Sequence, residues 1–185
     1  MGDYQFFIPP WTEAPVSRTD RQGFALPPVM PDRTALPAAF ENAYVKSIRA
    51  GNDDLLAVPL LIGGNEPVPA VEMVVSLNAA SVSGRVVTSR NTPVSRATVV
   101  VLPKGTAAVV ADRYRFTMSD DAGRFDFRGL PPGDYRLFAW EDVDAGAWFN
   151  PSFLAANERF AISLTLAEGQ RQSLDIAVIP AGATP

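Results

Sequence analysis

The stretch from Ser119 to Leu137 constrains the fold more than any other part of this sequence. It reads S-D-D-A-G-R-F-D-F-R-G-L-P-P-G-D-Y-R-L. Phe125 and Phe127 alternate with charged residues, which is the period-2 pattern of a strand with one buried side and one solvent-facing side. The sequence therefore predicts a half-buried β-strand here.

Turn residues bracket this strand on both sides. Gly123 ends an aspartate-rich turn before the strand, and we predict that it adopts a positive φ. After the strand, Pro132 and Gly133 fit positions i+1 and i+2 of a type II turn. A new strand is then predicted to begin at Tyr135.

Short apolar runs separated by prolines and glycines continue through the second half of the chain. The run Thr98–Leu102 is apolar almost throughout, so we predict a central strand covered on both faces. Short helical turns are predicted only at Leu36–Tyr44 and Asn150–Asn157. Regularly spaced short strands are typical of a β-sandwich. The strands predicted are Ser83–Val87, Thr98–Leu102, Tyr114–Met118, Arg124–Arg128, Tyr135–Trp140, Phe160–Leu166 and Ser173–Ile179.

The composition excludes several classes of function. The chain has no Cys and no His, which removes cysteine nucleophiles, Ser-His-Asp triads and imidazole acid/base catalysis. We therefore expect no enzyme, no catalytic residue, no metal site and no cofactor. A formal net charge of −4 with no basic face argues against nucleic acid as a partner. No apolar run is long enough to predict a transmembrane segment, and the N-terminus lacks the features of a signal peptide.

The first half contains a shorter copy of the pattern in the second half. Residues 19–32, T-D-R-Q-G-F-A-L-P-P-V-M-P-D, align with the stretch that begins at Ser119, and Val71–Val75 aligns with Leu174–Val178. Both matches fall at an offset of about 100 residues, which indicates an internal repeat. We predict a truncated β-domain at 1–80 and a complete sandwich at 81–185. The truncated copy lacks a counterpart of the strand Ser83–Val87, so one sheet edge is expected to lack a partner.

The second half resembles the carboxypeptidase regulatory-like domain, a transthyretin-like, seven-stranded β-sandwich related to Cna B-type repeats. The resemblance rests on the motifs S-G-x-V, P-V-x-x-A-x-V and D-x-x-G-x-F-x-F-x-x-L-P-P-G-x-Y. It implies an all-β, Ig-like fold, export, a structural or adhesive role and no catalysis, as in bacterial multi-repeat exported proteins. In this sequence the motifs stand at Ser83–Val87, Pro93-Val94, Ala97–Val101 and Thr117–Leu137.

The N-terminal run Tyr4–Ile8 is the first candidate interaction site. It is apolar and prone to form a strand, and its candidate partner-binding residues are Tyr4, Phe6, Phe7 and Ile8. It can pair with a neighbouring subunit by strand addition, which builds a filament if the contacts do not close. Alternatively, it pairs within its own truncated domain.

The aromatic loop from Trp140 to Phe153 is the second candidate. Exposed aromatic rings beside carboxylates can stack on a sugar, and the candidate residues are Trp140, Asp142, Asp144, Trp148 and Phe149. The alternative, which we favour, is that these large aromatics fold back over the sandwich and are buried. Glu141, Asp142 and Asp144 also form a weak candidate for glycoside cleavage, which nothing else in the chain supports.

Acidic pairs at Asp53-Asp54, Asp120-Asp121 and Asp142/Asp144 lie in predicted loops, where oxygen-rich side chains can hold Ca²⁺. None has the spacing of a known calcium loop, and aspartates commonly cap turns instead. We therefore favour turn capping.

The leading hypothesis is a non-enzymatic extracellular or cell-surface structural module that self-associates, or contacts neighbouring domains, through its sheet edges. Two alternatives stay open. One is a carbohydrate-binding module that uses the loop Trp140–Phe153, and the other is a spacer within a larger exported protein.

Overall fold

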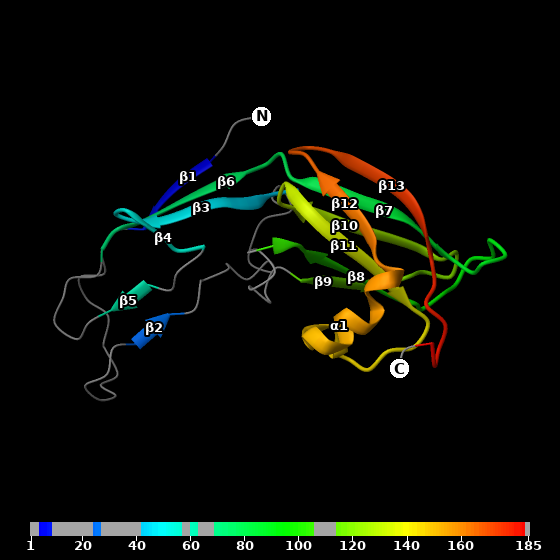
Figure 1. Cartoon of the computed structure of the whole chain (residues 1–185). Helices are drawn as coiled ribbons and strands as arrows, with labels where there is room; N and C mark the ends of the chain where they lie inside the picture. The colour runs from blue at the N-terminus through cyan, green and yellow to red at the C-terminus, as the bar shows by residue number, and fades with distance from the viewer. Residues whose placement is uncertain are drawn as a thin grey trace. The chain divides into compact units, whose positions relative to one another are not determined.

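The computed structural model describes residues 4–8, 24–26, 42–56, 60–62, 69–105 and 114–183. For 4–8, 24–26 and 60–62 it describes the backbone and its pairing. The chain divides into two compact units, Met1–Asn78 and Ala79–Pro185. Both are drawn in Figure 1, and each is described by itself below. None of the helices in the described ranges has the length and apolar character needed to cross a membrane.

The unit Ala79–Pro185 is a β-sandwich, as predicted. One sheet has the order β10-β7-β13 and is called the β7 sheet, and the other has the order β12-β11-β8-β9 and is called the β8 sheet. All seven predicted strands are present, with ends shifted by a few residues. They are β7 (Ala80–Val87), β8 (Thr98–Pro103), β9 (Arg115–Met118), β10 (Arg124–Leu130), β11 (Gly133–Trp140), β12 (Ile162–Leu166) and β13 (Arg171–Ala177).

The main core lies between these two sheets. Phe125 and Phe127 of β10 are buried in it, while the charged residues that alternate with them are exposed, as the period-2 pattern predicts. From the β8 sheet, Val99, Val101 and Leu137 enter the same core. The apolar face of each sheet is therefore removed from water by the other.

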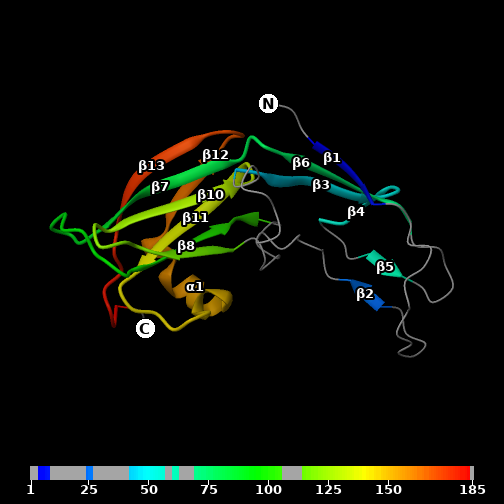
Figure 2. The same cartoon turned by 180° about the vertical axis from the view of Figure 1, so that it is seen from behind.

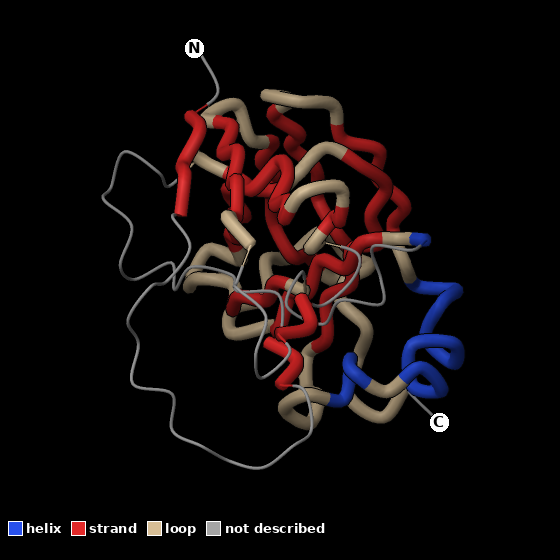
Figure 3. Tube along the Cα trace, turned by 90° about the vertical axis from the view of Figure 1, so that its left-hand side faces the viewer, coloured by secondary structure: helices blue, strands red, loops and turns tan. Residues whose placement is uncertain are grey.

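A second apolar layer covers the outer face of the β8 sheet. Val100, Leu102 and Phe138 pack there against a helical segment that contains α1 (Pro151–Asn157). Figures 1 and 2 show α1 beside β8 and β11, and Figure 3 draws its coil in blue outside the red strands. Strand β8 is thus buried on both faces, as predicted from its continuous apolar sequence.

Helix α1 begins where the sequence supplies both a cap and a compatible first residue. The Asn150 side chain accepts a hydrogen bond from the backbone N–H of Ser152, and Pro151 occupies the first helical turn. The predicted helical turn at Asn150–Asn157 is confirmed. The other predicted helical turn, Leu36–Tyr44, lies mostly outside the described residues, and Tyr44 itself begins a strand.

The turn before β10 forms as predicted. Gly123 has a φ of 74°, and a Cβ there would lie 2.7 Å from the carbonyl oxygen of Val86. The Asp120 carboxylate accepts hydrogen bonds from the backbone N–H groups of Ala122 and Arg124. Asp120 therefore caps the turn, in agreement with the interpretation that we favoured.

The predicted type II turn at Pro132-Gly133 is wrong. Gly133 has a φ of 151°, far from the value of about 80° that a type II turn requires, and it already belongs to β11. The corner is instead closed by the Tyr135 hydroxyl, which donates a hydrogen bond to the carbonyl oxygen of Pro131 at 2.7 Å. A local turn propensity was overridden by a side chain that bonds back across the corner.

A close approach between β7 and β13 accounts for the glycine of the S-G-x-V motif. The two strands pair in parallel, with Gly84 opposite Leu174. A Cβ on Gly84 would overlap the carbonyl oxygen of Leu174. No other residue type fits this position without moving the backbone.

The unit Met1–Asn78 contains a four-stranded sheet of order β1-β6-β3-β4, called the β6 sheet, and a two-stranded sheet of β2 and β5. A small core is formed by Ile48 and Ala50 of the β6 sheet together with Leu55. That this unit is a truncated repeat of the unit Ala79–Pro185 stays a prediction. Its strands are β1 (Tyr4–Ile8), β2 (Phe24–Leu26), β3 (Tyr44–Ala50), β4 (Asp53–Asp54), β5 (Leu60–Ile62) and β6 (Val71–Ser76).

Candidate interaction sites

Trp140, the first aromatic of the proposed sugar-binding loop, belongs to the outer apolar layer. Its side chain is 1% exposed and stacks on Phe138 with ring centroids 5.0 Å apart. The indole N–H donates to the side-chain oxygen of Asn157, which is itself buried. Because both faces of the ring lie inside the protein, Trp140 has no surface on which a sugar could stack.

Trp148 is also buried, at 4% exposure, in the short 3₁₀ helix η5 (Ala147–Phe149). Its ring contacts Phe116 of β9 at 5.2 Å and Phe149 at 6.0 Å between centroids. Its indole N–H has no acceptor within the described part of the chain. A buried donor without an acceptor costs on the order of 1–3 kcal/mol, so apolar contact must hold this ring in place. The interpretation that the loop folds its aromatics back is therefore correct for Trp140 and Trp148.

Phe149 is the one aromatic of the predicted set that stays exposed, at 52%. Its ring lies parallel to that of Tyr114, with centroids 5.5 Å apart and an interplanar angle of 3°. Phe116 and Met118 of β9 are also exposed, at 62% and 56%. We call the surface formed by Tyr114, Phe116, Met118 and Phe149 the edge patch.

Sequence reasoning missed Phe116 and Met118, although a signal was present. Tyr114, Phe116 and Met118 alternate with Arg115 and Thr117, so one face of this strand is apolar. Phe116 lies opposite Val100 in the sheet register, and Val100 belongs to the outer apolar layer. The apolar outer face of the β8 sheet therefore continues onto β9, where Phe116 and Met118 are left exposed.

The carboxylates of the loop are not gathered into a site. Asp142 and Asp144 are exposed, and Glu141 accepts a hydrogen bond from the backbone N–H of Ala181. Asp53 and Asp54 form strand β4 and not the predicted loop, and Asp54 accepts a hydrogen bond from the backbone N–H of Leu56 in the turn that follows. Within the described ranges, no group of three or more acidic side chains lies close enough together to hold a metal ion.

Strand β1 carries the candidate partner-binding residues Tyr4, Phe6, Phe7 and Ile8. It pairs antiparallel with β6 of its own chain, in a register that runs from Tyr4 opposite Val75 to Ile8 opposite Val71. Of the two pairings left open by the sequence, the structure therefore contains the one within the chain. Strand β1 is the last strand of the β6 sheet in that direction, because only β6 bonds to it among the described strands. The side chains of these four residues lie outside the described part of the structure.

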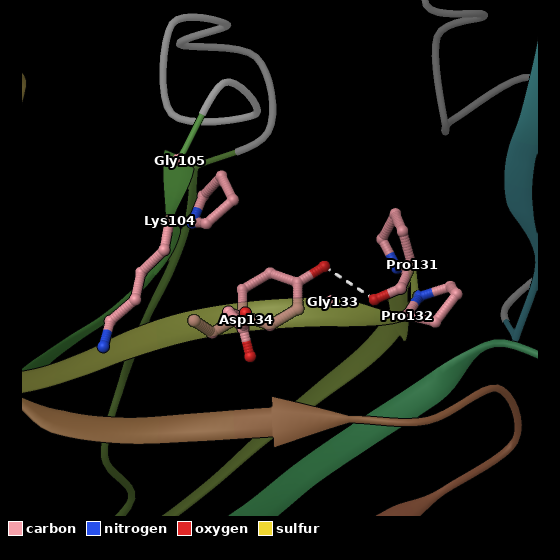
Figure 4. A pocket seen from close by; sticks show the side chains of 8 residues that line it. Lys104, Gly105, Pro131, Pro132, Gly133 and Asp134 are labelled. Carbon is pink, nitrogen blue, oxygen red and sulfur yellow. Dashed lines mark hydrogen bonds between the residues drawn. The ribbon is translucent and has the colours of Figure 1, made fainter.

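A small hollow of about 180 Å³ lies at the diproline corner (Figure 4). Its polar side chains are already engaged within the protein. Lys104 donates to the Ser163 hydroxyl at 2.7 Å, and Asp134 accepts from the Thr165 hydroxyl at 2.6 Å. With its ammonium and carboxylate groups satisfied, this hollow offers a ligand little to bind. It is lined by Pro103, Lys104, Gly105, Pro131, Pro132, Gly133, Asp134 and Tyr135.

Comparison with solved structures finds proteins of low sequence identity. A candidate carbohydrate-binding protein from Pseudomonas aeruginosa is 14% identical, with 53% of this chain and 87% of that chain covered and a TM-score of 0.33. The major pilin subunit of Bacillus cereus is 11% identical, with 74% and 56% covered and a TM-score of 0.37. The 5-hydroxyisourate hydrolase of Klebsiella pneumoniae is 21% identical, with 56% and 91% covered and a TM-score of 0.32. At these identities and TM-scores, no function follows from the similarity.

Comparison with curated proteins finds no match. The sequence profile of the carboxypeptidase regulatory-like domain matches residues 81–178, which is more than half of the chain. This range holds all seven strands of the sandwich except Ala80, the first residue of β7. It also holds the turn at Gly123 and the close approach at Gly84 that the motifs encode. The chain therefore belongs to the family of carboxypeptidase regulatory-like domains.

Proposed function

We propose that this chain is a non-enzymatic structural module that associates with copies of itself by strand addition at β1. The observation that carries the proposal is the position of β1 at the end of the β6 sheet, bonded to β6 alone among the described strands. An edge strand presents main-chain N–H and C=O groups that can pair with a further strand. The sequence Tyr-Gln-Phe-Phe-Ile contains no charge that would oppose such pairing.

The opposite edge of the β6 sheet supports this choice of edge. Strand β4 contains only Asp53 and Asp54, and both are exposed. A short, charged edge strand resists pairing, because an added strand would bring its backbone against the carboxylates. Of the two terminal strands described for the β6 sheet, β1 is therefore the more permissive. Its repeated use against a different surface gives a head-to-tail arrangement of subunits.

The proposal places the module outside the cell or on its surface. This location is supported by the family to which the chain belongs, because the resemblance to exported multi-repeat proteins of that family implies export. The absence of His and Cys from the whole sequence supports a role without catalysis.

Light scattering coupled to size exclusion tests the proposal over a range of protein concentrations. We expect the mass of the unaltered chain to rise with concentration, and deletion of residues 1–8 to leave a monomer. Asp53→Ala, on the opposite edge of the same sheet, serves as the matched control and should leave the mass profile unchanged. A monomer at every concentration, or assembly that survives the deletion, would overturn the proposal.

A carbohydrate-binding module is the second candidate, favoured by the exposed ring of Phe149 stacked beside Tyr114. Of the aromatics that we proposed for this role, only Phe149 presents a ring to solvent. Glycan-array binding that disappears in Phe149→Ala, with an unchanged melting temperature, would support this candidate. Equal glycan binding by the variant and by the unaltered protein would rule out this candidate function.

A further inference from the structure

The sandwich has four sheet edges, and on three of them the exposed side chains are mainly polar or charged. At the β12 edge, Ser163 and Thr165 are exposed and engaged by Lys104 and Asp134. Such side chains are how native proteins keep sheet edges from pairing with other chains.

The two edges of the β7 sheet are charged. On β10, Arg124, Asp126 and Arg128 are exposed, and Arg128 pairs with Asp126. On β13, Asp175 is hydrogen-bonded by Arg85 at 2.8 Å, and this bond lowers the pKa of the Asp175 carboxyl. Aspartates are ionised at neutral pH in any case, so this edge carries charge as well.

The fourth edge, β9, is different. Among the described strands it bonds to β8 only. Its exposed side chains are Phe116 and Met118, each more than half exposed, whereas Arg115 and Thr117 are partly buried. Figure 1 shows β9 beside β8, the strand to which it is hydrogen-bonded. Exposed apolar side chains on an open strand edge are the arrangement that favours pairing with another chain.

The edge patch is also held in position before any partner arrives. Phe116 and Phe149 both contact the buried ring of Trp148, and Phe149 stacks on Tyr114. Side chains already ordered by packing lose little conformational entropy on binding, so a partner gains the full benefit of covering them.

We propose that the β9 edge is the acceptor for strand β1 of a second copy. This inference rests on the proposed function, because it names the surface against which β1 is added. The added strand would lengthen the β8 sheet by one strand and join it to the β6 sheet of the next copy. Because donor and acceptor are different surfaces of the chain, the contact builds a closed ring or an open chain of copies, depending on the rotation between neighbours.

The match between β1 and β9 supports this choice of occupant. Strand β1 has five residues and β9 has four, so their main chains can pair over nearly their whole lengths. The β1 sequence Tyr-Gln-Phe-Phe-Ile is mostly apolar and carries no charge, which suits an acceptor strand whose exposed side chains are Phe116 and Met118. Strands β2 and β5 have three residues each and would form fewer main-chain hydrogen bonds.

A mixing experiment tests this pairing in the full chain. The donor-deficient variant lacks residues 1–8, and the acceptor-deficient variants carry Phe116→Lys or Met118→Lys. We expect each variant alone to be monomeric, with self-association weakened by at least about tenfold. An equimolar mixture of donor-deficient and acceptor-deficient chains should form a dimer and nothing larger, because one intact contact remains per pair.

Thr165→Lys, on the opposite edge of the β8 sheet, is the matched control and should assemble like the unaltered protein. Circular dichroism should give Met118→Lys the same melting temperature as this control, because the Met118 side chain is exposed. Phe116→Lys also removes a contact with the buried ring of Trp148, so Met118→Lys is the variant that decides if the two differ in stability.

The outcomes separate the two proposals. If the acceptor-deficient variants assemble like the unaltered protein while the deletion variant does not, the β9 acceptor is wrong and the proposed function stands. If the deletion variant assembles and the β9 variants do not, β9 pairs with itself and both proposals are wrong. An unaltered chain that never assembles also overturns both.

Discussion

At the scale of single residues, the motif that begins at Ser119 is built by buried hydrogen bonds as well as by apolar contact. Ser119 is 4% exposed, and its hydroxyl accepts from the backbone N–H of Ala97 and donates to the carbonyl oxygen of Val94. It thereby fastens the segment before β8 to the turn that follows β9. The sequence placed this serine in a turn and gave no sign that its hydroxyl is buried.

We predict that Ser119→Ala lowers the free energy of unfolding by about 1–3 kcal/mol. The substitution removes the hydroxyl that pairs with the backbone N–H of Ala97 and with the carbonyl oxygen of Val94. Urea denaturation followed by fluorescence measures the change. Ser163→Ala is the control, since Ser163 is exposed and its bond to Lys104 can be replaced by water. Equal effects of the two substitutions would show that the Ser119 hydroxyl is dispensable.

At the scale of elements, the helical segment after β11 completes the outer layer of the β8 sheet. Trp148 and Leu154 are buried in this layer together with Phe138 and Trp140. The segment therefore stabilises the sandwich, and its exposed member Phe149 contributes to the edge patch.

We predict that Trp148→Ala lowers the free energy of unfolding by about 3–5 kcal/mol, because a large buried ring leaves a cavity when it is removed. Phe149→Ala should cost less than about 1 kcal/mol, since more than half of that side chain is already in water. Thermal denaturation of both variants makes the comparison. A stable Trp148→Ala protein would mean that the ring is not part of the core.

The seven strands of the sandwich could be predicted because their signals are local. Period-2 alternation at Phe125 and Phe127 and the continuous apolar run of β8 each specify a strand without reference to distant residues. The edge patch could not be predicted in this way. Whether Phe116 is buried or exposed depends on how far the segment containing Trp148 extends over the sheet, which is decided by packing between residues far apart in the sequence.

The same distinction explains the error at the diproline corner. Pro132-Gly133 is a type II turn sequence by local propensity, yet the Tyr135 hydroxyl fixes a different corner by bonding to Pro131. The candidate site at β1 was found from its apolar sequence, whereas its pairing with β6 depends on a register that no local pattern encodes.

At the scale of the whole molecule, the two units have separate cores. The main core and the outer layer of the sandwich consist of residues between Ala80 and Ala183, and the small core of the first unit consists of residues between Val45 and Met73. The stability of the sandwich should therefore depend little on the first unit.

We predict that residues 79–185 fold when produced alone, because this range contains its own complete core. The expected result is cooperative thermal unfolding together with blue-shifted tryptophan emission, since Trp140 and Trp148 are both buried in this unit. A non-cooperative transition with emission typical of solvated indole would show that the sandwich needs the first unit.

The parallel pairing of β7 with β13 has a consequence for how the protein is made. Arg85 and Asp175, which face each other across this pair, are 90 residues apart in the chain. Within the sandwich, β7 is synthesised first and β13 last, so β7 stays without this neighbour until nearly the whole domain has emerged from the ribosome. Contacts of such long sequence separation slow folding and leave nascent chains open to misassociation. A chain that ends before Arg171 lacks β13, so β7 would remain permanently open to association with other chains.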